Sequence, residues 1–445
     1  MASLKIHRRS HAAFTPGPYT PKDFAKRFST EKVSREPYRP AAHLKLLEGV
    51  SPHPREYPGY FENPGPLPFI KPGTSLQLNN DIFTVGDMIG EGGFAKVYSA
   101  CWVNGPAEER NTVLKVQMPA NDWEWYILGQ VDQRFDQLQH PLKEEETSWK
   151  RGFMTAPRCY TYRDGAVIIS QLQKMGTLLD LVNLTKNADK SIIEPIAIYL
   201  TAELLGLMEL LHSVNIVHAD LKPDNFLMRH TPSTSTSPSL QLIDFGKAID
   251  LKLEAVEEVK AKQNIVDRFE TPAGDDAGQK MDVEKNEPES EKSEPKTDKI
   301  ESESEKPEPK SKKSEPLSGL TKKTENGVKN EQDETGRTGK YHLDYFGIAG
   351  AAYCLLFGKY IEVGTVKNRW VVKGSFKRWW QVKLWEQFFD DMLNPKGEEK
   401  ECLPSLLEWR KKFLLLFEIE DLREGLVKAR EVIEIKLLEK WRRLL

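Results

Sequence analysis

The spacing of apolar residues changes along the chain from a strand-like to a helix-like pattern. Three short runs of strand-forming residues, 83–85, 96–98 and 113–116, are separated by turn residues, as in a small antiparallel sheet. After Pro195 the apolar positions recur every three or four residues, which is the period of a helix with a buried face. The pattern therefore predicts an α+β fold in which a small β-rich lobe precedes a larger helical lobe.

Two different segments precede the first strand-like run. Residues 1–42 are rich in Pro, Lys and Arg and show no sustained period of 2 or 3.6, so we expect a disordered basic arm. Residues 43–80 combine many prolines with aromatic and aliphatic anchors, which are rare in disordered linkers. They are expected to form an extended strap that packs on the folded domain.

Two later segments also differ from their surroundings. Residues 271–340 contain 18 acidic and 14 basic residues and no aromatic residue. Because so little apolar surface cannot offset the entropy of ordering, we expect a disordered charged insertion. Residues 421–445 carry apolar side chains on one helical face, which indicates a C-terminal helix packed on the body, with a dimerising coiled coil as the alternative. The small lobe and its hinge are expected at 81–173, and the helical lobe at 174–270 and 341–420.

Composition narrows the class of protein. The net charge is −3, so no global field attracts the chain to nucleic acid or to an anionic membrane, and no sequence-specific nucleic-acid binding is expected. Four scattered cysteines show neither paired metal-ligand spacing nor a disulfide framework. The best apolar run, 348–357, is about half a membrane span. The sequence therefore favours a reduced, intracellular protein that does not enter a membrane.

A glycine-rich stretch lies between the first two strand-like runs. Residues 89–97 read Ile-Gly-Glu-Gly-Gly-Phe-Ala-Lys-Val, which fits the kinase loop over the phosphates of ATP except that Ala95 replaces the third glycine. Glycines let the backbone lie close to phosphates, although a hairpin without a ligand would look similar. Lys115 ends the third run, where a kinase places the lysine that neutralises the α and β phosphates. By itself this lysine would be interpreted as a surface residue.

The strongest signal is a pair of motifs in the helical lobe. Residues 218–225 read His-Ala-Asp-Leu-Lys-Pro-Asp-Asn, and residues 240–246 read Leu-Gln-Leu-Ile-Asp-Phe-Gly. In the kinase template, Asp220 accepts the proton of the substrate hydroxyl. Asn225 and Asp244 hold magnesium ions, and Lys222 is the choice typical of serine/threonine kinases. A lone aspartate could be a helix cap, but that alternative does not explain the ordered set.

The remaining ATP contacts are expected around a buried strand. Residues 167–173 indicate a strand that runs into the hinge, where backbone groups would hold adenine and Ser170 would be the gatekeeper. Generic sheet core is an equally good local interpretation. ATP and Mg²⁺ are the expected cofactors. The expected ATP-binding residues are Ile89, Gly90, Gly92, Gly93, Val97, Val113, Lys115, Gln171, Gln173 and Leu227.

Longer runs around these motifs resemble one family, the mitotic checkpoint kinases known as budding uninhibited by benzimidazole. The most distinctive run is Val-Leu-Lys-Val-Gln-Met-Pro-Ala-Asn-Asp-Trp-Glu-Trp-Tyr-Ile at 113–127. The other similar runs are 43–49, 67–72, 176–179, 218–225, 341–347 and 355–360. The resemblance covers most of residues 43–417 outside the insertion.

The resemblance implies a bilobal protein-kinase fold and specific residue roles. Glu124 would pair with Lys115, only nine residues before it, and Asp344 would begin a buried helix that supports the catalytic loop. The expected catalytic residues are Lys115, Glu124, Asp220 and Lys222. The 43–80 strap would pack on the small lobe.

The resemblance also implies a mitotic role. Spindle-assembly checkpoint signalling at kinetochores is expected, with a serine/threonine protein substrate such as a nucleosomal histone tail, and with kinetochore checkpoint proteins as partners. The expected location is the nucleus and the kinetochore, with the cytoplasm as the alternative. The expected oligomeric state is a monomer.

Three departures from the family pattern leave two alternatives open. No helical-repeat kinetochore-binding domain and no motif for the family's propeller partner is found. The Ala-Pro-Glu element that follows the activation segment is missing, although residues 265–271 resemble the family's equivalent stretch. The alternatives are a pseudokinase scaffold that transfers no phosphate, and a serine/threonine kinase of another cellular role that lacks kinetochore targeting.

Overall fold

A computed structural model describes residues 40–138, 148–186, 193–230, 237–256, 340–396 and 403–442. All of these belong to one of two compact units of the chain, and the second unit, residues 263–333, lies outside the described residues. Most of the predicted arm and of the predicted insertion, and the stretch 265–271, therefore also lie outside the described residues.

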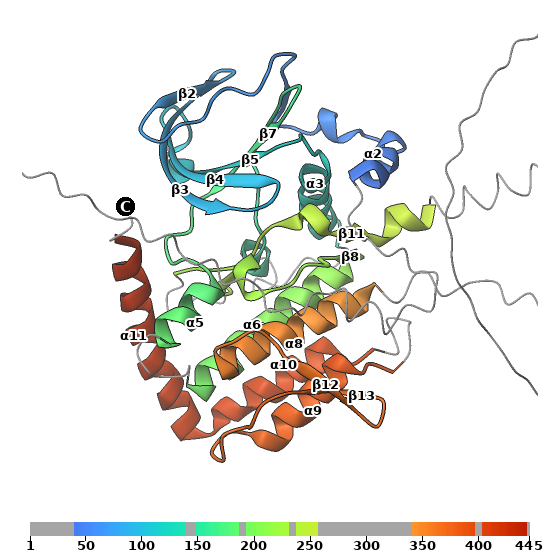
Figure 1. The fold of residues 1–445 in the computed structure, drawn as a ribbon, viewed down its shortest axis with the longest axis vertical. Coiled ribbons are helices and arrows are strands. Elements are labelled where there is room, and N and C mark those ends of the chain that lie inside the picture. Colours follow the sequence, from blue (N-terminus) through green and yellow to red (C-terminus); the bar gives the residue numbers. More distant parts are fainter. Residues whose placement is uncertain are drawn as a thin grey trace, which may run out of the picture. The chain divides into compact units, whose positions relative to one another are not determined.

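The small lobe is a seven-stranded sheet (Figure 1). The strand order is β1-β6-β7-β5-β4-β3-β2, and every pairing is antiparallel except that of β1 with β6, which is parallel. The strands are β1 (Tyr60–Glu62), β2 (Ser75–Leu78), β3 (Asp81–Glu91), β4 (Ala95–Trp102), β5 (Asn111–Gln117), β6 (Arg158–Thr161) and β7 (Ala166–Gln171). The three strand-like runs of the sequence lie in β3, β4 and β5. In the parallel pair, β1 belongs to the segment before the first predicted strand and forms the outermost strand of the sheet next to β6.

The helix of the small lobe, α3 (Trp123–Asp136), is held from the side by residues of the 43–80 segment. The ring of His43, in α2 (Pro40–Glu48), stacks on Trp123 with the ring centroids 4.1 Å apart. The Trp125 indole donates to the Pro54 carbonyl in the short helix η1 (Pro54–Glu56), at 3.0 Å. Figure 1 shows α2 and α3 as neighbours beside the sheet. Apolar anchors between the prolines of this segment thus contact the folded domain.

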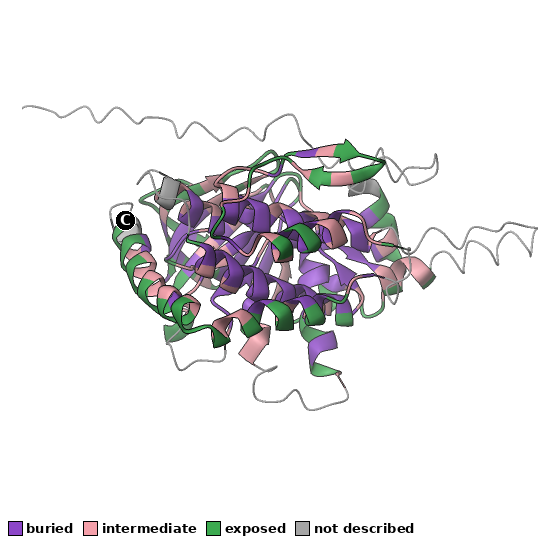
Figure 2. Ribbon diagram, turned by 90° about the horizontal axis from the view of Figure 1, so that it is seen from below, coloured by how far each residue is buried: buried purple, intermediate pink, exposed green. Residues whose placement is uncertain are grey.

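The large lobe is built of helices whose apolar faces meet in one core. Its helices are α5 (Leu178–Lys186), α6 (Glu194–Ser213), α8 (Tyr341–Phe357), α9 (Val382–Leu393), α10 (Leu406–Leu415) and α11 (Glu420–Arg442). By length and composition α6 could cross a membrane, but 72 % of its most apolar window is buried inside the fold, as in a core helix. Figure 2 shows the buried residues concentrated in the central helices and the exposed ones on outer faces such as that of α11.

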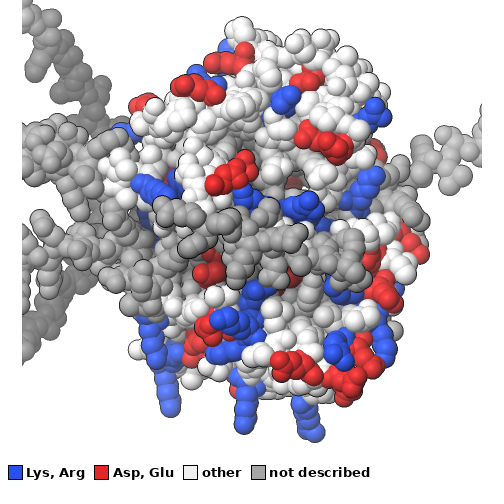
Figure 3. All heavy atoms as spheres, turned by 180° about the vertical axis from the view of Figure 1, so that it is seen from behind, with Lys and Arg blue, Asp and Glu red and all other residues white. Residues whose placement is uncertain are grey.

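Short two-stranded sheets carry the segments nearest the cleft between the lobes. β9 (Phe226–Met228) pairs with β10 (Leu240–Leu242), and β8 (Ile216–Val217) pairs with β11 (Ile249–Asp250). A third pair, β12 (Val363–Val366) with β13 (Arg369–Val372), lies on the helical lobe. The first two pairs place residues 218–225 and 244–248 side by side. On the face seen in Figure 3, Lys and Arg side chains are interspersed with Asp and Glu, in keeping with the small net charge.

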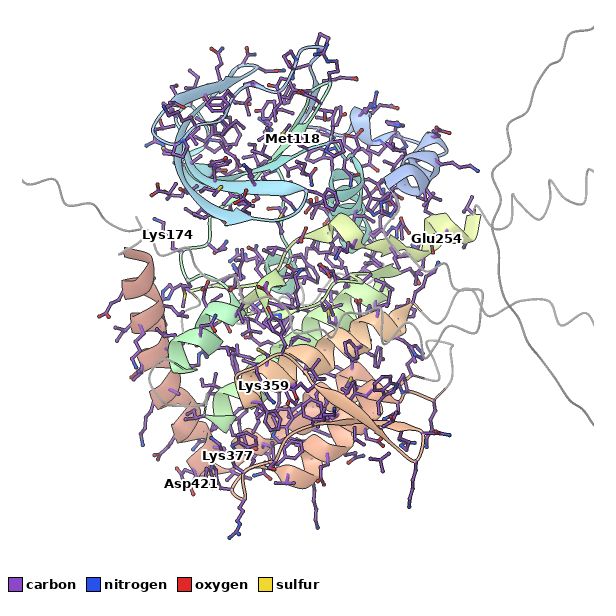
Figure 4. The ribbon with its side chains drawn as sticks, viewed as in Figure 1. Met118, Lys174, Glu254, Lys359, Lys377 and Asp421 are labelled. Carbon is purple, nitrogen blue, oxygen red and sulfur yellow. The ribbon has the colours of Figure 1, made fainter. Side chains whose placement is uncertain are left out.

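The C-terminal helix α11 packs with one stripe of apolar side chains against α5 and α6. Leu426 and Leu437 in this stripe are buried, whereas Val427 and Val432 on the opposite side are about half exposed. Near its end, Leu438 lines a cavity of about 350 Å³ together with Gln173 of the hinge and with Lys174, which follows it. Figure 4 shows Lys174 between the two lobes, next to the C-terminal part of α11. The helix thus reaches the outer side of the hinge.

Candidate active site

An ion-paired triad connects the two lobes. Lys115 on β5 lies 2.8 Å from Glu124 on α3 and 2.6 Å from the Asp244 Oδ1, measured from its Nζ. The nine-residue spacing suffices because a short loop, residues 118–122, leads directly from β5 into α3. The structure thus places the predicted Lys115–Glu124 pair in contact with Asp244, the residue predicted to bind magnesium.

Buried hydrogen bonds hold Glu124 in place. Its side chain is fully buried, and its carboxylate accepts from Lys115, from the Gln117 amide at 2.7 Å and from the Phe245 backbone N–H. Burial raises the pKa of Glu124, while the Lys115 ammonium opposes this effect and stabilises the carboxylate. Burial also disfavours the charged Lys115, but Glu124 and Asp244 together raise its pKa above the ordinary value. Each charged group thus has a bonded partner of opposite sign, which offsets the cost of burying its charge.

The catalytic loop is fixed by one buried carboxylate. Asp344, in the first turn of α8, accepts from the backbone N–H of His218 at 2.9 Å and of Ala219 at 2.8 Å. The ring of His212 on α6 lies 2.9 Å from the same carboxylate. Ala219 has a φ of 61°, an uncommon left-handed conformation for a residue with a side chain. The bonds to Asp344 hold this strained turn and so direct the next residue, Asp220, into the cleft.

Asp220 lies among three donors. The Lys222 Nζ is 2.9 Å from its Oδ2, the Lys247 Nζ is 3.0 Å from its Oδ1, and the Asn225 amide donates to its backbone carbonyl at 2.9 Å. Only 13 % of the Asp220 side chain is exposed. These contacts fix the position of the Asp220 carboxylate, as proton acceptance from a hydroxyl requires.

Asp244 and Asn225 form a donor set that fits magnesium. The Ile243 N–H donates to the Asn225 carbonyl at 3.0 Å, which brings the two residues close, and the Asn225 amide nitrogen is bound, so that its oxygen is the available ligand atom. Burial opposes ionisation of Asp244, but Lys115, with His218 and Lys222, lowers the pKa of Asp244 to about 2. Its side chain is 41 % exposed. An ionised carboxylate and an amide oxygen are hard oxygen ligands, as Mg²⁺ prefers.

The predicted ATP-binding residues lie in the glycine loop, on β5, in the hinge and on β9. Gly90 and Val97 face each other in the β3–β4 hairpin, and the Gly92 N–H donates to the Ala95 carbonyl at 2.8 Å, so that the loop closes without the third glycine. Ile89 lies at the end of β3 and Gly93 in the turn, and Val113 lies on β5. Ser170 and Gln171 end β7, and Gln173 follows in the hinge, with its side chain bonded to that of Gln171 at 3.3 Å. Leu227, on β9, forms an isolated bridge with Thr177 below the hinge.

A second polar group, fully buried, joins α3 to the segment after Asp244. Arg134 donates to both carboxylate oxygens of Asp250 and to the Val214 carbonyl, and the Tyr126 hydroxyl donates to Asp250 at 2.7 Å. Asp250 also accepts from the backbone N–H of Lys252 at 3.0 Å. This arrangement fixes the last turn of α3 against the large lobe, whereas Glu124 lies in the first turn of the helix.

Sequence reasoning missed three kinds of residue in this region. Gln117 lies two positions after Lys115 on the same strand, so that the period of two could have placed both on one face. Lys247 directly follows the Asp-Phe-Gly motif, but its ion pair with Asp220 leaves no local signal. Arg134 and Asp250 are 116 positions apart, and no sequence pattern joins them.

Comparison with known proteins identifies the fold and the family. The protein kinase domain family matches residues 144–266. The mitotic checkpoint serine/threonine-protein kinase BUB1 of Mus musculus is 30 % identical over 79 % of this chain and 27 % of its own length. The spindle assembly checkpoint serine/threonine-protein kinase BUB1 of Saccharomyces cerevisiae is 25 % identical over 77 % of this chain and 28 % of its own. The chain belongs to the BUB1 family of checkpoint kinases.

The fold of this family member agrees with a solved structure. The crystal structure of the BubR1 kinase domain superposes with a TM-score of 0.63 and 23 % identity, over 89 % of this chain and 99 % of that one. The predicted bilobal kinase fold is thereby confirmed. The chain spans only about a quarter of the length of the mouse and yeast relatives.

Proposed function

We propose that this chain is an ATP- and Mg²⁺-dependent protein serine/threonine kinase of spindle-assembly checkpoint signalling. The observation that carries the proposal is the triad in which Lys115 contacts Glu124 at 2.8 Å and Asp244 at 2.6 Å. In kinases this pair and this aspartate must both be in place before phosphate transfer can occur. A scaffold without activity would not need to keep all three charges within bonding distance.

The residues divide the work of phosphoryl transfer among them. Lys115 would bind the α and β phosphates, and the glycine loop would cover them. Asp244 and Asn225 would hold Mg²⁺, which supplies charge neutralisation on the phosphate oxygens when it is bound. Asp220 would orient the acceptor hydroxyl and take its proton, and Lys222 would stabilise the charge on the transferring group. Gln171 and Gln173 would bind adenine through their backbone groups.

The cellular part of the proposal rests on the relatives. Their names describe checkpoint kinases, and a chain with the same kinase region would phosphorylate a serine or threonine of a protein, for which a nucleosomal histone tail is our candidate. Kinetochore checkpoint proteins would be its partners, and the nucleus and the kinetochore its location. Imaging the tagged chain in dividing cells tests this part: enrichment at kinetochores is expected, and uniform distribution throughout mitosis would favour another cellular role.

Phosphate transfer from radiolabelled ATP tests the enzymatic part. The wild-type chain is compared with Asp244→Asn, which removes the ligand charge but keeps the size of the side chain. Incorporation by the wild type should exceed that of the variant by about a thousand-fold or more. Equal incorporation would favour the pseudokinase scaffold. Thermal unfolding of both proteins serves as the control for correct folding.

A further inference from the structure

Two lysines bind one carboxylate at the catalytic base. The Lys222 Nζ lies 2.9 Å from the Asp220 Oδ2, and the Lys247 Nζ lies 3.0 Å from the Asp220 Oδ1. Phosphoryl transfer accounts for Lys222, whose charge offsets that of the transferring group, but it leaves Lys247 without a task. Within the described residues, Lys247 forms its ion pair with Asp220, which also pairs with Lys222. Asp220 therefore binds two ammonium groups, of which Lys222 also interacts with the Asp244 carboxylate.

The backbone holds Lys247 at this position. It ends the short helix η5 (Phe245–Lys247), in which the Ala248 N–H donates to the Phe245 carbonyl at 3.0 Å. The Trp123 indole donates to the Ala248 carbonyl at 2.9 Å, and Phe245 and Ala248 are fully buried. The Lys247 side chain, in contrast, is 46 % exposed. A fixed backbone thus places a solvent-accessible ammonium beside the base, where packing does not require it.

We propose that Lys247 determines substrate specificity by binding an acidic side chain next to the acceptor serine or threonine. This inference rests on the proposed kinase function. An acceptor hydroxyl that bonds to Asp220 must approach the carboxylate oxygens that the lysines now contact. Lys247 then exchanges the carboxylate of Asp220 for one on the substrate, and its charge stays paired throughout. A substrate with a neutral residue next to its acceptor offers Lys247 no carboxylate. Lys247 then either loses its partner or stays on Asp220 and competes with the acceptor hydroxyl for that carboxylate.

The alternative role for Lys247 is to stabilise the transferring phosphoryl group, as Lys222 does. The two roles predict different kinetics. A cation that serves transfer itself accelerates all substrates by the same factor, whereas a cation that binds a substrate carboxylate changes the ratio between substrates. Only the second role depends on the residue beside the acceptor.

The test uses two sets of three peptides. In the first set the residue directly after the acceptor is Glu, Gln or Lys, and in the second set the residue directly before the acceptor is varied in the same way. For the wild-type chain, kcat/KM should be roughly five-fold higher with Glu than with Gln in at least one set, the size of a partly exposed ion pair. In Lys247→Met this ratio should fall to about one. In Lys247→Glu the Lys peptide should become the best of the three. Lys247→Arg should keep the preference for Glu.

Lys359→Met is the matched control. This lysine has a similar exposure, 42 %, and a carboxylate partner, Glu362, at 2.7 Å, but it lies on the helical lobe (Figure 4). It should keep the wild-type ratio. A ratio of one in the wild type, or an unchanged ratio in Lys247→Met, would overturn the inference. The same holds if Lys247→Met loses all three peptides equally while Lys247→Arg transfers phosphate, because the cation then serves transfer. A wild type inactive with every peptide would instead overturn the kinase function itself, and this inference with it.

Discussion

Helix α3 contacts two groups of charges that differ in exposure, one through Glu124 in its first turn and the other through Arg134 in its last turn. In the first group, Lys115, Asp220 and Asp244 form the cleft cluster, in which Asp244 is 41 % and Lys115 15 % exposed. In the second group, Arg134 and Asp250, with Tyr126, form the buried cluster, in which Asp250 is fully buried and bonded at both oxygens. The partly exposed groups of the cleft cluster can bind a ligand. The groups of the buried cluster are enclosed by the fold and bind each other. We conclude that the first serves chemistry and the second serves the position of α3.

The largest expected effect is a loss of activity without a loss of structure. Asp220→Asn and Asp244→Asn remove charge from the cleft cluster and little apolar contact, so each should lower kcat by about a thousand-fold or more while the melting temperature stays within a few degrees. Peptide phosphorylation and thermal unfolding are measured on the same preparations. If either variant fails to fold, the cleft cluster also serves structure and the comparison breaks down.

The next effect concerns the segment that packs on α3. Removal of residues 1–80 deletes the buried leucines Leu47, Leu76 and Leu78, each of which contributes on the order of 1.5–3 kcal/mol. This truncation should lower the melting temperature strongly and impair ATP binding, because α3 loses its outer support. Removal of residues 1–42 should change neither property. Equal melting temperatures for the two truncations would show that the 43–80 strap does not stabilise the domain.

A single substitution in the buried cluster should have a smaller but distinct effect. Asp250→Asn leaves Arg134 buried with a neutral partner, which should cost about 3 kcal/mol of unfolding free energy. Denaturant unfolding measures this loss, and Asp220→Asn is the matched control, since it makes the same chemical change in the cleft cluster. Equal losses of stability in the two variants would contradict the division of tasks between the clusters.

The contact between α2 and α3 should also make the stability of the protein depend on pH. Burial lowers the pKa of His43, stacked on Trp123, from 6.5 to about 4. Because the folded state prefers the neutral ring, this contribution to stability is complete above pH 6.5 and is lost as the pH falls towards 4. Between pH 7 and pH 5 the wild type should lose about 2 kcal/mol more than His43→Phe, which keeps a stacking ring without a titrating group. Parallel losses in denaturant titrations at both pH values would exclude His43 as the cause.

The sequence predicted the cleft cluster because phosphoryl transfer constrains residue types at short spacings. Asp220, Lys222 and Asn225 lie within six positions, and Asp244 follows in a second short motif. The buried cluster could not be predicted, since Arg134 and Asp250 meet only after both lobes have folded. The parallel pairing of β1 with β6 was missed for the same reason, because it joins residues about a hundred positions apart. Local patterns record chemistry and period, but not which distant elements will meet.

The smallest expected effect concerns phosphorylation, whose removal should leave kcat/KM almost unchanged. Kinases that are activated by loop phosphorylation usually carry an arginine directly before the catalytic aspartate in the sequence to receive the phosphate, but Ala219 at that position carries no charge. Here Arg134 and Asp250 hold α3 against the large lobe, and Lys115 holds α3 to β5 through Glu124. Bacterially expressed enzyme treated with phosphatase should therefore match enzyme from dividing cells in kcat/KM within about two-fold. Mass spectrometry of both preparations is the control for their phosphate content. A large gap that maps to a phosphate within residues 244–275 would contradict this expectation, and Asp250→Asn, which loosens α3, should then increase the dependence on that phosphate.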